Sequence, residues 1–186
     1  PISEVLAGKR AFLVDLDGVV YTGARAIHGA REFFAHLRSH GLPFHLITNN
    51  STRTAADVAA HLQRLDMPVT EVDVLTSPDA TAIHVEMQCG KRARIYAIGE
   101  DGIVRALIAH GFSLTADPDR ADVVVCGLDR RLTYDRLRRA CAALRRGVPL
   151  FATNPDRALP TETGFLPGNG ATLAYLEVAT GVTPVV

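Results

Sequence analysis

The stretch Ala11-Phe12-Leu13-Val14-Asp15-Leu16-Asp17-Gly18-Val19-Val20 decides the fold, because an apolar run ends there in two carboxylates and a glycine. The run predicts a buried strand, and two like charges at its tip would repel each other and lose hydration on burial. A plain turn with two solvated aspartates is the alternative, since Asp and Gly are common turn residues. A divalent cation between Asp15 and Asp17 would turn the repulsion into a binding site.

These residue types suit phosphoryl transfer. A carboxylate such as Asp15 can attack a phosphoryl group and form an aspartyl-phosphate. A second carboxylate, Asp17, can protonate the leaving oxygen and later activate water. Mg²⁺ would shield the negative charges that keep a carboxylate away from a phosphate. Gly18 permits a tight turn, so that the backbone can approach a ligand closely.

Composition restricts the function classes. The 186 residues suffice for one good core or two small domains, and a formal net charge of zero argues against nucleic acid or an anionic membrane as partner. No apolar run reaches the length of a membrane-spanning helix, and residues 1–9 lack the layout of a signal peptide. Cys89, Cys126 and Cys141 are widely spaced, which predicts small buried side chains in a reducing compartment. We therefore expect a cytoplasmic protein.

Strand-like runs alternate with helical periods along the chain, which predicts an α/β fold with mostly parallel sheet. The pattern starts again after Ser77, which we expect to cap a helix that begins at Pro78, so a domain boundary is predicted near residues 76–78. The predicted strands are residues 11–14, 44–48, 72–76, 94–98, 122–126 and 150–153, and the predicted helices are residues 30–37, 55–62, 78–87, 102–110, 134–146 and 172–180.

A second polar motif follows the predicted strand 44–48. Hydroxyl and amide side chains from Thr48 to Thr54 stand where a strand passes into a helix, an arrangement that can bind an anion. Ser51, Thr52 and Thr54 could instead only cap the helix. Ligands bind at the carboxyl ends of the strands in an open parallel sheet, so we expect Thr48 to face one crevice with the two aspartates.

Together, residues 15–21 and 47–51 resemble the haloacid dehalogenase superfamily. More narrowly they are similar to its NagD-type, p-nitrophenylphosphatase-like and phosphoglycolate phosphatase-like branch. The segments Phe151-Ala152-Thr153-Asn154-Pro155-Asp156 and Leu166-Pro167-Gly168-Asn169-Gly170-Ala171 resemble the same branch, so the likeness covers nearly the whole chain.

The resemblance implies a Rossmann-like parallel-sheet core, of which residues 1–76 would be the N-terminal half. Residues 77–182 would form an inserted α/β cap that folds over the crevice and excludes water. Residues 183–186 would start the return to the core. Family members often dimerise through the cap, so the resemblance also implies a homodimer.

The resemblance further implies roles for individual residues. Asp15 would be the nucleophile and Asp17 the general acid and base, and the Asp15 side chain and the Asp17 backbone carbonyl would bind Mg²⁺. Gly18, Thr48 and the backbone of Asn49 would contact the phosphoryl group. Asn50 and Ser51 would shape the phosphate-binding site.

The family pattern continues beyond the motifs present here. A Gly-Lys-Pro segment would supply a lysine, and a Gly-Asp…Thr-Asp segment would complete the metal site. Only Lys9 and Lys91 are present, in other contexts, and strands would lie on one side of the first strand only. We therefore expect the 186 residues to be part of a longer protein, and a stop codon directly after Val186 in the gene would contradict this.

The sequence therefore predicts a Mg²⁺-dependent phosphatase that acts on a small phosphorylated metabolite through an aspartyl-phosphate. One alternative is a catalytically incomplete binding or assembly module of the same fold. A second alternative is a phosphate-binding domain of the response-regulator type. That domain needs no cap, and roughly a hundred additional residues of α/β pattern count against it.

Overall fold

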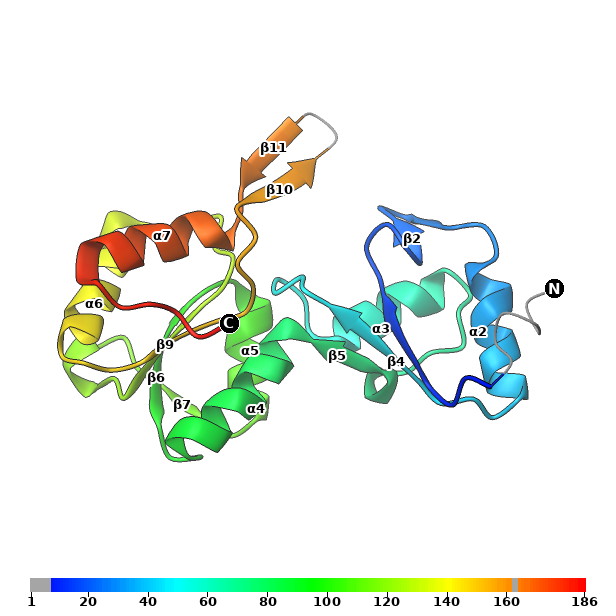
Figure 1. Cartoon of the computed structure of the whole chain (residues 1–186), viewed down its shortest axis with the longest axis horizontal. Coiled ribbons are helices and arrows are strands. Elements are labelled where there is room, and N and C mark those ends of the chain that lie inside the picture. Colours follow the sequence, from blue (N-terminus) through cyan, green and yellow to red (C-terminus); the bar gives the residue numbers. More distant parts are fainter. Residues whose placement is uncertain (1–7, 162–163) are drawn as a thin grey trace. The chain divides into compact units, whose positions relative to one another are not determined.

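The computed structural model describes residues 8–161 and 164–186, which fall into two compact units. Within the described residues, the first unit runs to Thr48 and resumes over Ala55–Leu75, and the second comprises Asn49–Thr54 and Thr76–Val186. Each unit has a parallel sheet with helices packed on it (Figure 1). The predicted α/β fold class is confirmed.

In the first unit, a three-stranded sheet in the order β1-β4-β5 packs against two helices. Strand β1 lies at an edge and pairs in parallel with β4 alone, as the sequence led us to expect. Leu13 is 74% exposed, because successive strand residues point to opposite faces and Leu13 lies on the face opposite Phe12 and Val14, which pack against the core under the helices. The elements of this unit are β1 (Phe12–Asp15), β2 (Tyr21–Thr22), β3 (Arg25–Ala26), α2 (Ala30–Ser39), β4 (Phe44–Thr48), α3 (Ala55–Arg64), a 3-10 helix (Glu71–Asp73) and β5 (Val74–Thr76).

The core of the first unit follows the helical spacing seen in the sequence. Apolar residues three and four apart put one face of each helix on the sheet, and Phe34, Leu37 and Leu62 become fully buried there. Strand β4 contributes Phe44 and Leu46, which alternate with residues outside the core. The expected helices and strands therefore form in this unit.

The second unit is a four-stranded parallel sheet, in the order β7-β6-β8-β9, with helices on both faces. Alternate residues of its strands enter separate cores: Val123 and Val125 pack with α4 and α5, whereas Val124 and Cys126 pack with α6 and α7. Strands buried on both faces must be apolar throughout, as β8 is. The elements are α4 (Ser77–Cys89), β6 (Arg94–Ile98), α5 (Asp101–Ala109), β7 (Ser113–Leu114), a 3-10 helix (Pro118–Arg120), β8 (Val123–Cys126), α6 (Tyr134–Arg145), β9 (Leu150–Ala152), β10 (Ala158–Thr161), β11 (Gly164–Pro167) and α7 (Asn169–Thr180).

Several boundaries differ from the predictions. Ser77 is the first residue of α4 rather than its cap, because the Thr76 hydroxyl accepts the Asp79 N–H and serves as the N-cap. Helix α7 begins at Asn169 instead of residue 172. The sequence also missed the antiparallel pairs β2–β3 and β10–β11, which are short and lack a strong apolar alternation.

Residues 183–186, expected to lead back to the core, lie beside the sheet of the second unit. Val185 bridges to Phe151 in parallel, and its backbone N–H donates to the carbonyl of Leu150 at 2.8 Å. Among the helices described, none combines the length and apolar character needed to cross a lipid bilayer.

The three cysteines differ in environment. Cys126 is fully buried in β8, as predicted, and burial raises the pKa of its thiol to about 12. Cys89, at the end of α4, is exposed, and Cys141 is half-buried. The prediction that all three are buried was therefore wrong for Cys89, because its helix ends there at the surface.

We expect iodoacetamide at pH 8 to alkylate Cys89 first and Cys141 more slowly, and to leave Cys126 unmodified in the folded protein. The thiolate is the reacting form, and Cys126 is both inaccessible and protonated at that pH. Peptide mass spectrometry after timed labelling measures this, with urea-unfolded protein as the control. Labelling of Cys126 as fast as Cys89 in the native state would contradict the burial of β8.

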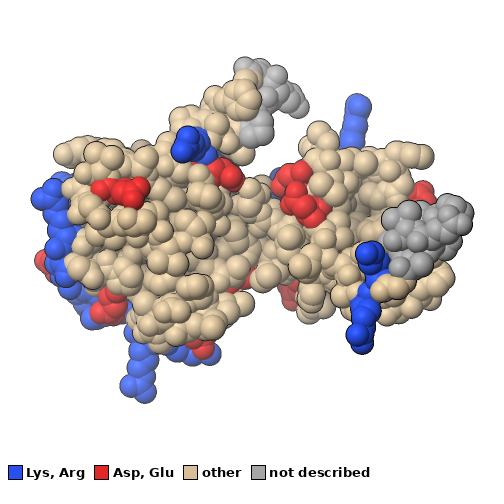
Figure 2. Space-filling model, in the orientation of Figure 1, with Lys and Arg blue, Asp and Glu red and all other residues tan. Residues whose placement is uncertain are grey.

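Many arginines of the second unit gather around α6, where Figure 2 shows Lys and Arg side chains along one edge. Most of them pair with carboxylates of the same unit. Arg130 holds Glu100 with two guanidinium hydrogen bonds of 2.7 Å each, and these lower the pKa of that carboxyl. Arg136 binds Asp129, whose side chain is only 1% exposed. The cluster is thus largely a set of neutralised pairs.

The Glu100–Arg130 pair should make stability depend on acid pH. Since the pKa of Glu100 is lowered on folding from its ordinary value of 4.5, its contribution is complete above pH 4.5 and disappears as the pH falls through the folded-state value. We expect Glu100→Gln to lower the free energy of unfolding by about 1 kcal/mol at pH 7, because Arg130 is largely solvent-exposed. Differential scanning calorimetry across this range should show wild type and variant converging in acid.

Glu71→Gln is the matched control for this comparison, since Glu71 is exposed in the first unit. Its free energy of unfolding at pH 7 should stay close to that of the wild type. A difference between wild type and Glu100→Gln that persists unchanged at acid pH would contradict the assignment.

Candidate active site

Asp15 is the last residue of β1, and its side chain is exposed. Asp17 follows after one residue and is also exposed, while Leu16 between them is fully buried in the core. The buried Leu16 side chain therefore fixes the backbone at the end of β1, and the carboxylates on either side of it point to solvent.

The turn after β1 depends on Gly18. Its backbone has φ +80°, a conformation that L side chains rarely adopt. The Gly18 N–H donates to the carbonyl of Tyr21 at 2.9 Å, and the Leu16 carbonyl accepts the N–H of Val20 at 2.9 Å. These bonds fold the chain tightly around the tip that carries the two aspartates.

Thr48 ends the neighbouring strand β4, where only 6% of the residue is exposed. Asp15 pairs in register with Ile47, so Thr48 stands one position beyond the residue opposite Asp15. Adjacent strands lie about 5 Å apart. Because parallel strands end at the same edge, Asp15, Asp17 and Thr48 gather at the carboxyl edge of this sheet.

Electrostatics at this edge favour a cation. No basic side chain pairs with Asp15 or Asp17 within residues 8–161 and 164–186, so two neighbouring negative charges stay uncompensated. Nor do the described residues contain a group of three or more Asp, Glu, His or Cys side chains that could together hold a metal ion. Two carboxylates suit Mg²⁺, which keeps several waters and completes its shell with substrate phosphate. The residues present therefore fit a hard divalent cation held by few protein oxygens.

The other predicted site residues, Asn49, Asn50 and Ser51, belong to the second unit. Ser51 is 2% exposed, and its hydroxyl accepts the N–H of Leu128 at 3.3 Å. The Asn50 side chain closes its own turn by accepting the N–H of Thr52 at 3.1 Å. Their side chains thus hold the shape of the loop that follows Thr48.

Further polar residues of the second unit contact this loop. Asp156 accepts an amide N–H from Asn49 at 2.6 Å, which makes it a candidate that the sequence motif of residues 151–156 pointed to. Gly102 and Gly127, which also border the loop, were missed. Neither lies in a motif that the sequence analysis singled out.

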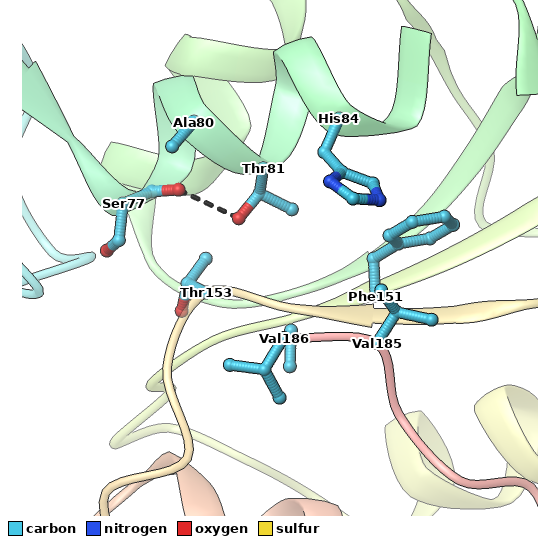
Figure 3. Close-up of a pocket in the computed structure, with 9 residues that line it drawn as sticks. Ser77, Ala80, Thr81, His84, Phe151, Thr153, Val185 and Val186 are labelled. Atoms are coloured by element: carbon cyan, nitrogen blue, oxygen red, sulfur yellow. Dashed lines mark hydrogen bonds between the residues drawn. The ribbon is translucent and has the colours of Figure 1, made fainter. Parts of the chain in front are cut away.

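A cavity of about 200 Å³ lies within the second unit (Figure 3). The ring of His84 faces that of Phe151 at one end, with ring centroids 5.5 Å apart. None of the predicted site residues lines this cavity. Its lining is Ser77, Ala80, Thr81, His84, Phe151, Ala152, Thr153, Val185 and Val186.

Comparison with known proteins identifies the family of this chain. Residues 12–113 match the family described as haloacid dehalogenase-like hydrolase. The 5'-nucleotidase YutF of Bacillus subtilis is 45% identical over 176 residues, which are 95% of this chain and 68% of that protein.

Two solved structures are also similar. A double mutant of the thermostable NPPase of Geobacillus stearothermophilus has a TM-score of 0.88 and 44% identity, and the match covers 95% of this chain and 68% of that one. The glycerol phosphate phosphatase Rv1692 of Mycobacterium tuberculosis, in complex with magnesium, has a TM-score of 0.87 and 37% identity, over 95% of this chain and 54% of that one.

The matched residues lie in both units, and the family model, the sequence relatives and the solved structures all indicate the same family. They confirm the recognition of the family, and they agree with a phosphomonoester hydrolase as the enzyme class. The chain belongs to the haloacid dehalogenase-like hydrolases.

Proposed function

We propose that this protein is a Mg²⁺-dependent phosphatase that hydrolyses a small phosphorylated metabolite through an aspartyl-phosphate on Asp15. One observation carries the proposal: two exposed carboxylates, with no basic partner among the described residues, stand at the carboxyl end of β1, beside Thr48 at the end of β4. A strand tip that concentrates negative charge in this way gains no stability from it. A role in binding and chemistry explains the arrangement.

In the first step, a carboxylate oxygen of Asp15 attacks the phosphorus atom. The bond from phosphorus to the substrate oxygen breaks, and Asp17 in its protonated form gives that oxygen a proton, so the alcohol leaves neutral. The exposure of Asp15 gives a substrate access to its oxygen atoms.

In the second step, Asp17, now ionised, takes a proton from a water molecule. The hydroxide formed attacks phosphorus, the bond to the Asp15 oxygen breaks, and inorganic phosphate is released. Both steps use Asp15 and Asp17. The turn at Gly18 holds the two residues close together, so Asp17 can act first as acid and then as base on the same phosphoryl group.

Other residues of the proposed site bind and orient the phosphoryl group. The Thr48 hydroxyl and the backbone of Asn49 would hold its oxygens, while Asn50 and Ser51 keep the loop in shape. The Asp15 side chain and the Asp17 carbonyl would hold Mg²⁺, which when bound would offset the repulsion between carboxylate and phosphate.

The named activities of the relatives support a small phosphate ester as substrate. They include a 5'-nucleotidase and a glycerol phosphate phosphatase, both of which act on small phosphorylated molecules. The alternative of a catalytically incomplete module is not favoured, because these relatives are named as enzymes.

We further propose the domain roles implied by the resemblance. Residues 1–76 would form the N-terminal half of the core, residues 77–182 the cap, and residues 183–186 the start of the return to the core. A homodimer through the cap is part of the same proposal, and sedimentation equilibrium of the full-length protein would test it.

Asp15→Asn should lower turnover of p-nitrophenyl phosphate by about 10⁴-fold or more, because the amide cannot act as nucleophile. Its melting temperature should stay near that of the wild type, since Asp15 is exposed and makes no ion pair with any residue that the structure describes. Asp66→Asn is the matched control, as Asp66 is an exposed carboxylate of the same unit, 3.5 Å from Arg31. Normal turnover by Asp15→Asn would rule out Asp15 as nucleophile.

Chelation should remove the activity reversibly. We expect dialysis against EDTA to abolish turnover and added MgCl₂ to restore it, because the two carboxylates alone leave the substrate's negative charge unshielded. Steady-state assays before and after dialysis measure this, and circular dichroism checks that the fold persists. Full activity in excess EDTA would contradict the metal requirement.

A further inference from the structure

The loop Asn49–Thr54, directly after Thr48 in the chain, is enclosed by residues of the second unit. Gly102, at the start of α5, lies so close that a Cβ there would stand 2.6 Å from the Ser51 carbonyl oxygen. A Cβ on Gly127 would stand 3.1 Å from the Ser51 hydroxyl. A side chain at Gly102 would displace the loop backbone, so this glycine permits its close approach, whereas a Cβ on Gly127 would first collide with Ile103 at 2.1 Å.

Two hydrogen bonds fix the loop to the residues around it. The Leu128 N–H donates to the Ser51 hydroxyl at 3.3 Å, and the Ser77 hydroxyl donates to the Asn49 carbonyl at 3.1 Å. These bonds position the backbone of the loop and leave the Asn49 side chain for a separate contact.

That separate contact is Asp156. Its Oδ2 accepts an amide N–H from Asn49 at 2.6 Å and another from Asn154 at 2.8 Å. Hydrogen bonds to a charged acceptor are stronger than neutral ones, and the second donor holds the carboxylate in a fixed orientation. Asn49 and Asp156 are 107 residues apart, so this bond joins two distant loops.

The backbone of Asp156 is itself held in place by the start of α7. Its carbonyl accepts the Gly170 N–H at 2.8 Å, and the neighbouring Arg157 carbonyl accepts the Gly168 N–H at 3.0 Å. A Cβ on Gly168 would collide with the Asp156 carbonyl oxygen, and one on Gly170 with that of Pro155. The carboxylate is therefore presented from a rigid support.

We propose that Asp156 is a positioning residue that holds the phosphate-binding loop by fixing Asn49. The inference rests on the proposed function, in which the backbone of Asn49 binds the phosphoryl group. Asp156 acts through Asn49 and need not touch the substrate. A loop held in advance loses less freedom when the substrate binds and keeps its N–H groups aimed at the phosphoryl oxygens.

The test is a double-mutant cycle in the full-length protein with p-nitrophenyl phosphate. Asp156→Ala and Asn49→Ala should each lower kcat/KM about 10-fold. The double variant should have a kcat/KM no lower than that of the less active single variant, because both substitutions remove the same hydrogen bond. Asp156→Asn should stay within about 3-fold of wild type, since its amide oxygen can still accept from Asn49. Asp122→Ala, an exposed carboxylate of the same unit paired with Arg94, is the control and should leave kcat/KM unchanged.

Additive losses in the double variant, or normal kcat/KM for Asp156→Ala, would overturn the proposal. Melting temperatures close to wild type separate positioning from misfolding. A loss of activity in Asp156→Ala that Asp156→Asn does not relieve would also count against the hydrogen bond as the cause.

A second readout does not depend on activity. Hydrogen–deuterium exchange of the peptide that contains residues 49–54 should rise in Asp156→Ala and stay at the wild-type level in Asp122→Ala. If the wild type hydrolyses no phosphate ester, the proposed function fails, yet exchange still decides whether Asp156 holds the loop. Unchanged exchange in Asp156→Ala would overturn the positioning role.

Discussion

The parallel pairing of β1 with β4 is the constraint on which the candidate site depends. Hydrogen bonding sets Asp15 opposite Ile47, so the two strands end together and their polar residues emerge at one edge. The buried Leu16 holds the tip, and the turn at Gly18 folds the chain back. A shift of one residue in this register would exchange exposed and buried positions and take Asp15 away from the edge.

The second unit depends on a different constraint, a sheet buried on both faces. Successive residues of β8 enter opposite cores, which makes every position of that strand apolar. A buried polar residue, Asn169, ties this sheet to α7 by donating to the carbonyls of Cys126 and Asn154. Both polar atoms of the Asn169 side chain are hydrogen-bonded, so burying them costs little free energy, and the bonds order the start of the helix.

The loop after Thr48 combines a candidate phosphate-binding motif with contacts from distant parts of the second unit. The motif residues belong to a short segment, but the groups that shape the segment come from α5, from the end of β8 and from the loop before α7. Glycine at 102 makes this approach sterically possible, since a Cβ there would stand 2.6 Å from the Ser51 carbonyl oxygen. Two of the five residues expected at a phosphate site, Asn49 and Ser51, thus bond to residues more than fifty positions away in the sequence.

The sequence by itself determined the alternation of strands and helices, the candidate aspartates and Thr48, because hydrophobic periodicity and turn chemistry are local. Tertiary structure alone decided the cap of α4, the early start of α7 and the exposure of Cys89. It also decided which residues surround the loop Asn49–Thr54, including Gly102, Gly127 and Asp156. Local patterns specify which face of an element is apolar, whereas these contacts arise only when distant segments pack together, and no periodicity within one segment encodes its partner.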